Sequence, residues 1–199
     1  MIHTAYKVSQ LLKLPLAIEA IKGIGDHLLV GTKQGHLLMY SVDMTSPMAS
    51  EAGDNDSSEG HSVHVQLLRS NKSFSKKAIV QLDAVPDYSI LVALSDSIVS
   101  VHDIDLSVTN FPVITTLPRT KGASVFALNV TRVQSLTGET VCTVRLVVAV
   151  RRKLQLYYWK NRRFLDLQPD ISLADVPKSL AWCKDTICIG YELCDHFLF

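Results

Sequence analysis

An excess of charge of one sign is absent from this 199-residue chain, in which 20 Lys and Arg face 19 Asp and Glu. A formal net charge of +1 gives no overall attraction to nucleic acid or to an anionic membrane, so an electrostatic partner must be met by a local cluster. Hydrophobic residues make up 47% of the chain, which excludes a disordered or fibrous protein.

Long apolar runs are also missing. No stretch reaches the roughly 18 to 20 apolar residues that a membrane-spanning helix requires. The N-terminal MIHTAYKVSQLLKLPL has neither the apolar core nor the cleavage site of a secretory signal. We therefore expect a cytoplasmic protein whose membrane association is peripheral.

Cysteine is sparse. Cys142, Cys183, Cys188 and Cys194 all lie in or beside apolar strand patterns, which predicts buried, inert thiols without disulfides. Cys183 and Cys188 are too far apart for a zinc knuckle, and no second ligand pair follows. The sequence therefore predicts no metal and no cofactor.

Catalytic motifs are lacking too. The turn GTKQG (31–35) joins two strands and has no phosphate-loop spacing, so it is interpreted as a hairpin. The pair nearest to acid and base chemistry is His102 with Asp103, but no nucleophile motif accompanies it. The histidines are assigned to strand ends and surfaces. An enzyme with its site in a central channel is an alternative, but no small-molecule substrate is expected.

One pattern occurs four times: an apolar strand, a tight polar turn and a second apolar strand. It is found in LLVGTKQGHLLMY (28–40), ILVALSDSIVSVHDI (90–104), RLVVAVRRKLQLYYW (145–159) and TICIGYELCDHFLF (186–199). Repeated hairpins of this kind are typical of a β-propeller, whose central strands are buried on both faces.

The strands group into blades of four. The predicted strands are 17–22, 27–32, 36–42 and 62–69; 78–85, 89–95, 97–104 and 111–117; 124–131, 141–150, 153–159 and 163–167; and, in an unfinished blade, 178–182 and 186–190. Propellers close with four to eight blades. The fold class is therefore all-β, an incomplete β-propeller of about three and a half four-stranded blades, and we expect 1–199 to be the N-terminal part of a larger domain.

An acidic segment interrupts the first blade. Residues 44–61, MTSPMASEAGDNDSSEGH, contain no Lys or Arg and are rich in Ser, Gly, Asp and Glu. Such a segment buries too little apolar surface to offset its ordering entropy. We predict a disordered loop there.

Basic clusters lie at strand ends and turns: RSNKSFSKK (69–77), RTKG (119–122), RRK (151–153) and KNRR (160–163). Loops on one face of a propeller converge, so several clusters could form one positive patch for an acidic protein surface or anionic lipid head groups. The alternative is solvated loop charge. The candidate partner or lipid contacts are Arg69, Lys72, Lys76, Lys77, Lys121, Arg151, Arg152 and Lys153. Aromatic residues do not alternate with these cations, which argues against nucleic-acid binding.

Six blocks of the sequence, in order, resemble a known family. The blocks are LLVGTKQGHLLMY, RSNKSFSKK, SIVSVHDI, KGASVFALNV, VRRKLQLYYWKNRRF and DVPKSLAWCKDTICIGY. Together they are similar to the N-terminal citron-homology (CNH) domain of the Vam-six-like family of HOPS tethering subunits, also called vacuolar protein sorting-associated protein thirty-nine.

The resemblance implies a non-enzymatic scaffold, in which a β-propeller precedes a long α-solenoid. It implies other HOPS subunits and a late-endosomal Rab GTPase as partners, and a place on late endosomes, lysosomes or vacuoles, where membranes are tethered before fusion and in autophagy. A CORVET-type early-endosomal subunit, of the TGF-β receptor-associated type, shares part of the pattern. A regulatory CNH module of a signalling protein is a further alternative.

Overall fold

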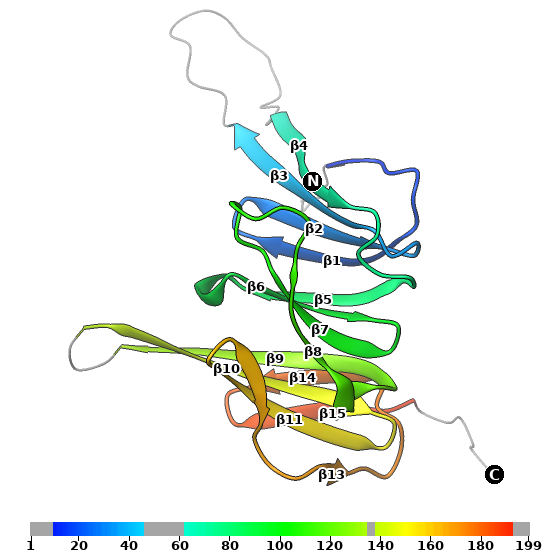
Figure 1. The fold of residues 1–199 in the computed structure, drawn as a ribbon, viewed down its shortest axis with the longest axis vertical. Coiled ribbons are helices and arrows are strands. Elements are labelled where there is room, and N and C mark those ends of the chain that lie inside the picture. Colours follow the sequence, from blue (N-terminus) through cyan, green and yellow to red (C-terminus); the bar gives the residue numbers. More distant parts are fainter. Residues whose placement is uncertain (1–9, 46–61, 135–137, 193–199) are drawn as a thin grey trace, which may run out of the picture.

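The computed structural model describes residues 10–45, 62–134 and 138–192. In these residues the chain forms four antiparallel sheets, and Figure 1 shows the first three in sequence order along the long axis of the molecule, with the fourth overlapping the third in that view. No α-helix occurs in the described part; two short 3-10 turns, Pro86–Tyr88 and Pro118–Thr120, connect strands.

The first sheet has the order β1 (Ile18–Ile24), β2 (His27–Thr32), β3 (Leu37–Thr45) and β4 (Ser62–Asn71). Its central strands are the most apolar, because they are covered on both faces. Gly31 on β2 has to lack a side chain, since a Cβ there would lie 2.8 Å from a methyl carbon of Ile79 on the next sheet.

The second sheet repeats the pattern with β5 (Ile79–Val85), β6 (Ile90–Ser95), β7 (Ile98–Asp103) and β8 (Val113–Leu117). The six residues of β6 are all buried. The β6–β7 hairpin turns through Asp96 and Ser97, whose φ values of 50° and 57° match the primed turns that twisted hairpins favour.

The third sheet consists of β9 (Ala123–Gln134), β10 (Thr140–Val150), β11 (Lys153–Lys160) and β12 (Arg163–Asp166). A two-residue strand, β13 (Ile171–Ser172), adds to the other end of β11. This short strand was not predicted.

The last sheet has two strands in the described residues, β14 (Ser179–Cys183) and β15 (Thr186–Gly190). One face of it packs against the third sheet. Cys183 and Cys188 are exposed, so the prediction that they are buried is wrong: no described sheet covers the face on which they lie. Cys142 is half-buried.

Apolar cores separate successive sheets. Leu29, Leu37, Ile79 and Leu91 fill the first interval, and Phe126 and Leu146 belong to the core between the second and third sheets. The outer face of the first sheet is covered by Leu12 and Leu14 of the N-terminal segment. The sheets of the described residues do not close into a ring.

These observations confirm the all-β, incomplete propeller and the order of its predicted strands. The largest difference in length is β9, which continues to Gln134 and, with β10, forms the long hairpin at the left of Figure 1. The predicted loop at 44–61 lies outside the described residues, apart from its first two, which belong to β3.

Candidate basic interface

The connections at one edge of the stack contact one another. The Ser75 N–H donates to the Gly35 carbonyl at 3.0 Å, which joins the β2–β3 turn to the β4–β5 connection. Lys77 of that connection forms an ion pair with Asp96 in the β6–β7 turn. The edge is therefore continuous across the first two sheets.

The same edge continues onto the third sheet. The Gly122 N–H donates to the Ser97 carbonyl at 2.8 Å, and Gly122 lies beside the Arg151 side chain. The Leu173 N–H donates to the Arg152 carbonyl at 2.9 Å, which attaches the 167–178 connection. We call this row of connections the basic edge; it comprises 32–36, 71–78, 95–98, 117–123, 150–153 and 167–178.

Seven of the eight predicted contact residues lie in the basic edge, and all seven are exposed. They are Lys72, Lys76, Lys77, Lys121, Arg151, Arg152 and Lys153. Lys33, in the β2–β3 turn, is also exposed there and was not predicted, because a single lysine in a hairpin turn forms no basic cluster in the sequence.

A pocket of about 690 Å³ opens beside the β10–β11 turn. Its lining residues are Lys121, Val150, Arg151, Arg152, Lys153, Gln155, Asp170, Ser172 and Leu173. Four cations and one carboxylate thus meet around one hollow. The tertiary structure, and not the spacing in the sequence, brings Lys121 next to the RRK turn.

Several charges of the edge are already paired. Arg119 binds Asp166 and Asp170 at 2.7 Å each, and the hydrogen bond that it donates to Asp166 raises the pKa of Arg119. Arg152 lies 3.5 Å from Asp175. Lys153 lies 4.0 Å from Asp170. Five exposed cations of the basic edge have no ion pair within the described residues: Lys33, Lys72, Lys76, Lys121 and Arg151.

Arg69, the eighth predicted contact, is a part-buried residue that joins two sheets. Its guanidinium donates to the carbonyls of Ile104, Asp105 and Val108, and it stacks 4.5 Å from the centroid of the Phe111 ring. Burial lowers its pKa. Arg69 therefore does not belong to the exposed surface of the basic edge.

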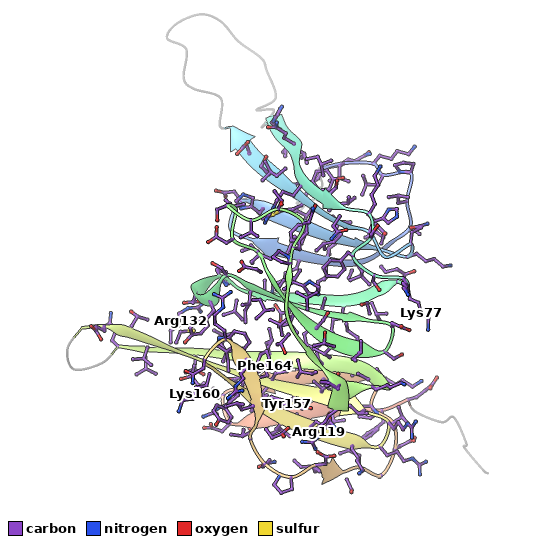
Figure 2. All side chains as sticks on the ribbon, viewed as in Figure 1. Lys77, Arg119, Arg132, Tyr157, Lys160 and Phe164 are labelled. Carbon is purple, nitrogen blue, oxygen red and sulfur yellow. The ribbon has the colours of Figure 1, made fainter. Side chains whose placement is uncertain are left out.

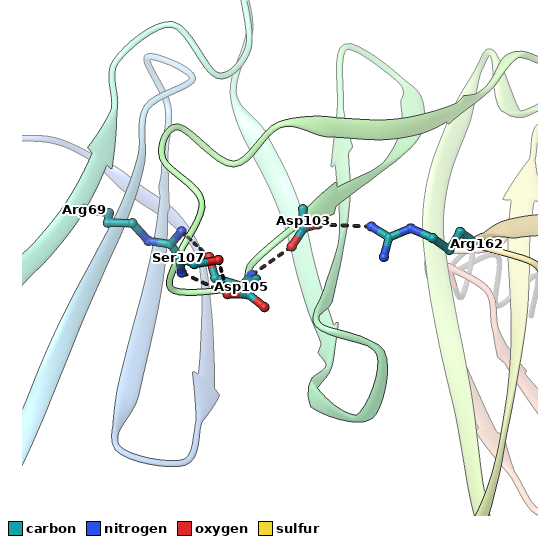
Figure 3. A network of polar contacts seen from close by, with 5 residues as sticks. All are labelled: Arg69, Asp103, Asp105, Ser107 and Arg162. Carbon is teal, nitrogen blue, oxygen red and sulfur yellow. Dashed lines mark hydrogen bonds and ion pairs between the residues drawn. The ribbon is translucent and has the colours of Figure 1, made fainter.

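The other edge of the stack includes a cation that joins two sheets, Arg162, as Figure 3 shows. Arg162, in the β11–β12 turn, donates to the Asp103 carboxylate at 3.0 Å, and that carboxylate also accepts the Asp105 N–H at 2.9 Å. Arg69 reaches the Asp105 carbonyl from the first sheet at 3.0 Å. Two hydrogen bonds from Ser107 lower the pKa of Asp105. Three sheets are linked in this way.

We call this edge, formed by 24–27, 85–90, 103–113, 160–163 and 183–186, the paired edge. Arg132, near the end of β9, donates through two nitrogens to Asp87, and the hydrogen bond lowers the pKa of that carboxyl. Figure 2 places Lys77 and Arg132 on opposite sides of the stack.

His102 and Asp103 do not form a catalytic pair in the described structure. Asp103 is bound to Arg162, whereas the His102 ring is 3% exposed and stacks on Phe74. His102 Nδ1 donates to the Phe111 carbonyl at 3.0 Å, so Nε2 accepts from the Ser100 hydroxyl at 2.8 Å. Burial lowers the pKa of His102. The prediction that the histidines lie at strand ends and surfaces holds for His102 only in part: it is next to the last residue of β7, but it is buried.

The described residues contain neither a membrane-spanning helix nor a cluster of metal-ligating side chains. No helix there is long and apolar enough to cross a membrane. No group of three His, Cys, Asp or Glu side chains in the described ranges is placed to hold a metal ion.

Comparison with known families decides the kind of propeller. The CNH domain family matches residues 24–194, which is most of the chain. The chain belongs to the CNH domain family. The resemblance expected from the six sequence blocks is thereby confirmed.

Curated relatives share this CNH sequence over nearly the whole chain. The Vam6/Vps39-like proteins of Mus musculus and Homo sapiens are 43% and 42% identical to it over 98% of its length. The vacuolar protein sorting-associated protein 39 homolog of Drosophila melanogaster is 34% identical over 96%. The chain spans about a fifth of the length of these relatives, 20–21%.

Solved structures support the fold alone. The computationally designed Ika4 protein has a TM-score of 0.56 at 13% identity and covers 94% of this chain and 92% of its own. The AfRom2 CNH domain has a TM-score of 0.50 at 14% identity, over 87% of this chain and 49% of its own.

Proposed function

We propose that this chain is the N-terminal CNH propeller region of a HOPS-type tethering subunit and acts as a non-enzymatic interaction scaffold. The single observation that carries the proposal is 43% identity with a Vam6/Vps39-like protein over 98% of the chain. A match of this extent reaches all four sheets and their connections, which favours a shared role as well as a shared fold.

The finer part of the proposal concerns place and partners. The scaffold associates peripherally with late endosomes, lysosomes or vacuoles, binds other HOPS subunits and a late-endosomal Rab GTPase, and promotes vesicle tethering and fusion, including fusion in autophagy. The names of the relatives support a sorting role. The basic edge supplies an exposed surface with unneutralised charge, which suits recognition by affinity and avidity rather than catalysis.

Affinity purification of the tagged full reading frame from its own cells, followed by mass spectrometry, tests this proposal. We expect the core subunits that the two tethering complexes share, together with HOPS-specific partners. An unrelated protein that carries the same tag gives the background of co-purifying proteins. Failure to recover any tethering subunit would refute the assignment.

Two alternatives have distinct outcomes in the same experiment. Recovery of CORVET-specific partners would assign the chain to the TGF-β receptor-associated type of subunit. A kinase or Rho-pathway set would indicate a regulatory CNH module of a signalling protein. The relatives named above favour the HOPS type over both.

A further inference from the structure

We propose that the pocket beside the β10–β11 turn binds the phosphorylated head group of an anionic lipid. This binding attaches the basic edge to the membrane surface. The inference rests on the proposed function, because it names a ligand class for the contact surface of that scaffold. It concerns the pocket formed by Lys121, Arg151, Arg152, Lys153 and Gln155.

The charge of the pocket matches a phosphate monoester. Four cations line it, and its carboxylate, Asp170, is already held by Arg119 at 2.7 Å. Lys121 and Arg151 have no ion pair in the part of the chain that the structure describes. A phosphate group with a charge near −2 would neutralise these two cations and accept their charge-assisted hydrogen bonds.

The lining also provides neutral donors. Gln155 is 6% exposed, and its carboxamide oxygen accepts the Tyr157 hydroxyl at 2.8 Å, a bond that does not use the amide N–H groups. The Ser172 hydroxyl lines the same hollow. Guanidinium, ammonium, amide and hydroxyl donors together suit the several acceptor oxygens of a phosphorylated inositol ring.

The surroundings of the pocket favour a membrane over a soluble phosphopeptide. Ile171 and Val176 lie in the connection that forms one wall, and they are 38% and 37% exposed. The unpaired lysines Lys33 and Lys76 extend the positive surface along the edge. Apolar side chains beside dispersed cations fit the interface of an anionic bilayer, whereas a peptide confined to the pocket would use neither.

Vesicle flotation of the 199-residue chain tests the proposal. The vesicles are phosphatidylcholine alone, phosphatidylcholine with a phosphatidylinositol monophosphate, and phosphatidylcholine with phosphatidylserine adjusted to the same surface charge. The test variant is Lys121→Gln with Arg151→Gln. The matched control is Lys160→Gln with Arg163→Gln, which removes the same charge from exposed residues beside the β11–β12 turn.

We expect the unchanged chain to bind the phosphoinositide vesicles best. Each neutralised cation should weaken binding roughly fivefold, so the pocket variant should lose well over tenfold while the control stays close to the unchanged chain. A soluble inositol phosphate should compete, whereas inorganic phosphate should compete weakly.

Three results would overturn the inference: equal losses in the pocket variant and the control, equal binding to both anionic vesicles, or binding of a phosphopeptide without binding to vesicles. Circular dichroism of both variants shows whether they are folded. The assay contains no tethering subunit, so its failure leaves co-purification of the complex unaffected, and the two proposals can fail separately.

Discussion

The basic edge and the paired edge of the sheet stack both carry many cations, but they use them differently. At the paired edge, Arg69, Arg132 and Arg162 each bind oxygen atoms on a neighbouring sheet. At the basic edge, Lys121, Arg151 and other exposed cations have no ion pair within the described residues. Both edges contain both kinds of cation, since Arg119 of the basic edge binds Asp166, and Lys160, Arg163 and Lys184 of the paired edge have no ion pair within the described residues. The basic edge has more exposed cations without an ion pair, five against three, and is therefore the better surface for a partner.

Part-buried arginines and exposed lysines differ in hydration as well as in position. A guanidinium that is part-buried against carbonyl oxygens has lost its water, and it is stabilising only while those oxygens stay in place. An exposed lysine keeps its hydration and contributes little to folding. Substitutions should therefore reduce stability at the paired edge and reduce binding at the basic edge.

Substitution of Gly35 gives the largest expected loss of stability, and it is an exception to this division because Gly35 lies on the basic edge. Gly35 on the basic edge has φ of 81°, and a Cβ there would lie 2.7 Å from the Lys77 carbonyl oxygen. Gly35→Ala should cost about 3 kcal/mol. Gly25→Ala on the paired edge, with φ of 53° and open space around it, should cost about 1 kcal/mol. Urea unfolding of both variants measures the difference in the free energy of unfolding. Equal losses of stability would contradict the close packing of the β2–β3 turn against the β4–β5 connection.

Arg69 is the strongest test of the paired edge. Arg69→Met keeps an apolar stem but removes the guanidinium that donates to the carbonyls of Ile104, Asp105 and Val108, of which the Asp105 carbonyl still accepts the Val108 N–H. We expect a loss of about 2 to 3 kcal/mol in the free energy of unfolding. Arg69→Lys should recover part of this, since an ammonium can reach some of the same oxygens. A loss below that of an exposed control such as Lys72→Met would show that the network has no stabilising role.

His102 gives a smaller and pH-dependent effect. Burial lowers its pKa from the ordinary value of 6.5, so the unfolded chain binds the proton more readily than the folded chain does. The stability that His102 contributes is fully present above pH 6.5, and it is lost as the pH falls through the pKa of His102 in the folded chain. The loss should be about 1 kcal/mol per pH unit in that interval.

His102→Gln should flatten this dependence when thermal unfolding is followed from neutral to mildly acidic pH. The variant is expected to be less stable than the unchanged chain at neutral pH and to approach it in acid. A parallel pH dependence in the two proteins would place the titrating group elsewhere.

The smallest effect comes from two matched turn arginines. Arg151 and Arg162 both have positive φ and exposed side chains, but of the two only Arg162 has an ion pair in the described structure, with Asp103. Arg162→Gln should cost about 0.5 kcal/mol, and Arg151→Gln should cost nothing measurable. A double-mutant cycle with Asp103→Asn isolates the pair. An absent coupling energy would mean that the two edges do not differ in this respect.

Much of the fold was predictable because each hairpin is encoded locally. Apolar strands flank Asp96 and Ser97, and others flank Arg151 and Arg152, so a turn between buried strands was the natural reading. The two-residue β13 carries too little pattern to be predicted. The exposed Cys183 and Cys188 were missed because an apolar strand does not reveal whether both of its faces are covered.

The candidate site was less predictable. Arg69 and Lys77 belong to one basic run in the sequence, yet Arg69 lies on β4 against the second sheet and Lys77 lies in the exposed connection that follows. The basic clusters 160–163 and 151–153 are similar in sequence. Strand β11 lies between them, so antiparallel pairing places the two turns at opposite edges of the sheet.

The sequence by itself determined the all-β class, the order of the hairpins and the family, because periodic apolar residues and turn residues act over a few positions. The tertiary structure alone decided which cations are paired, which four line the pocket beside the β10–β11 turn, and that His102 is buried. These depend on which sheet covers which face and which edge each turn reaches. They are properties of residues distant in sequence, brought together by stacked sheets.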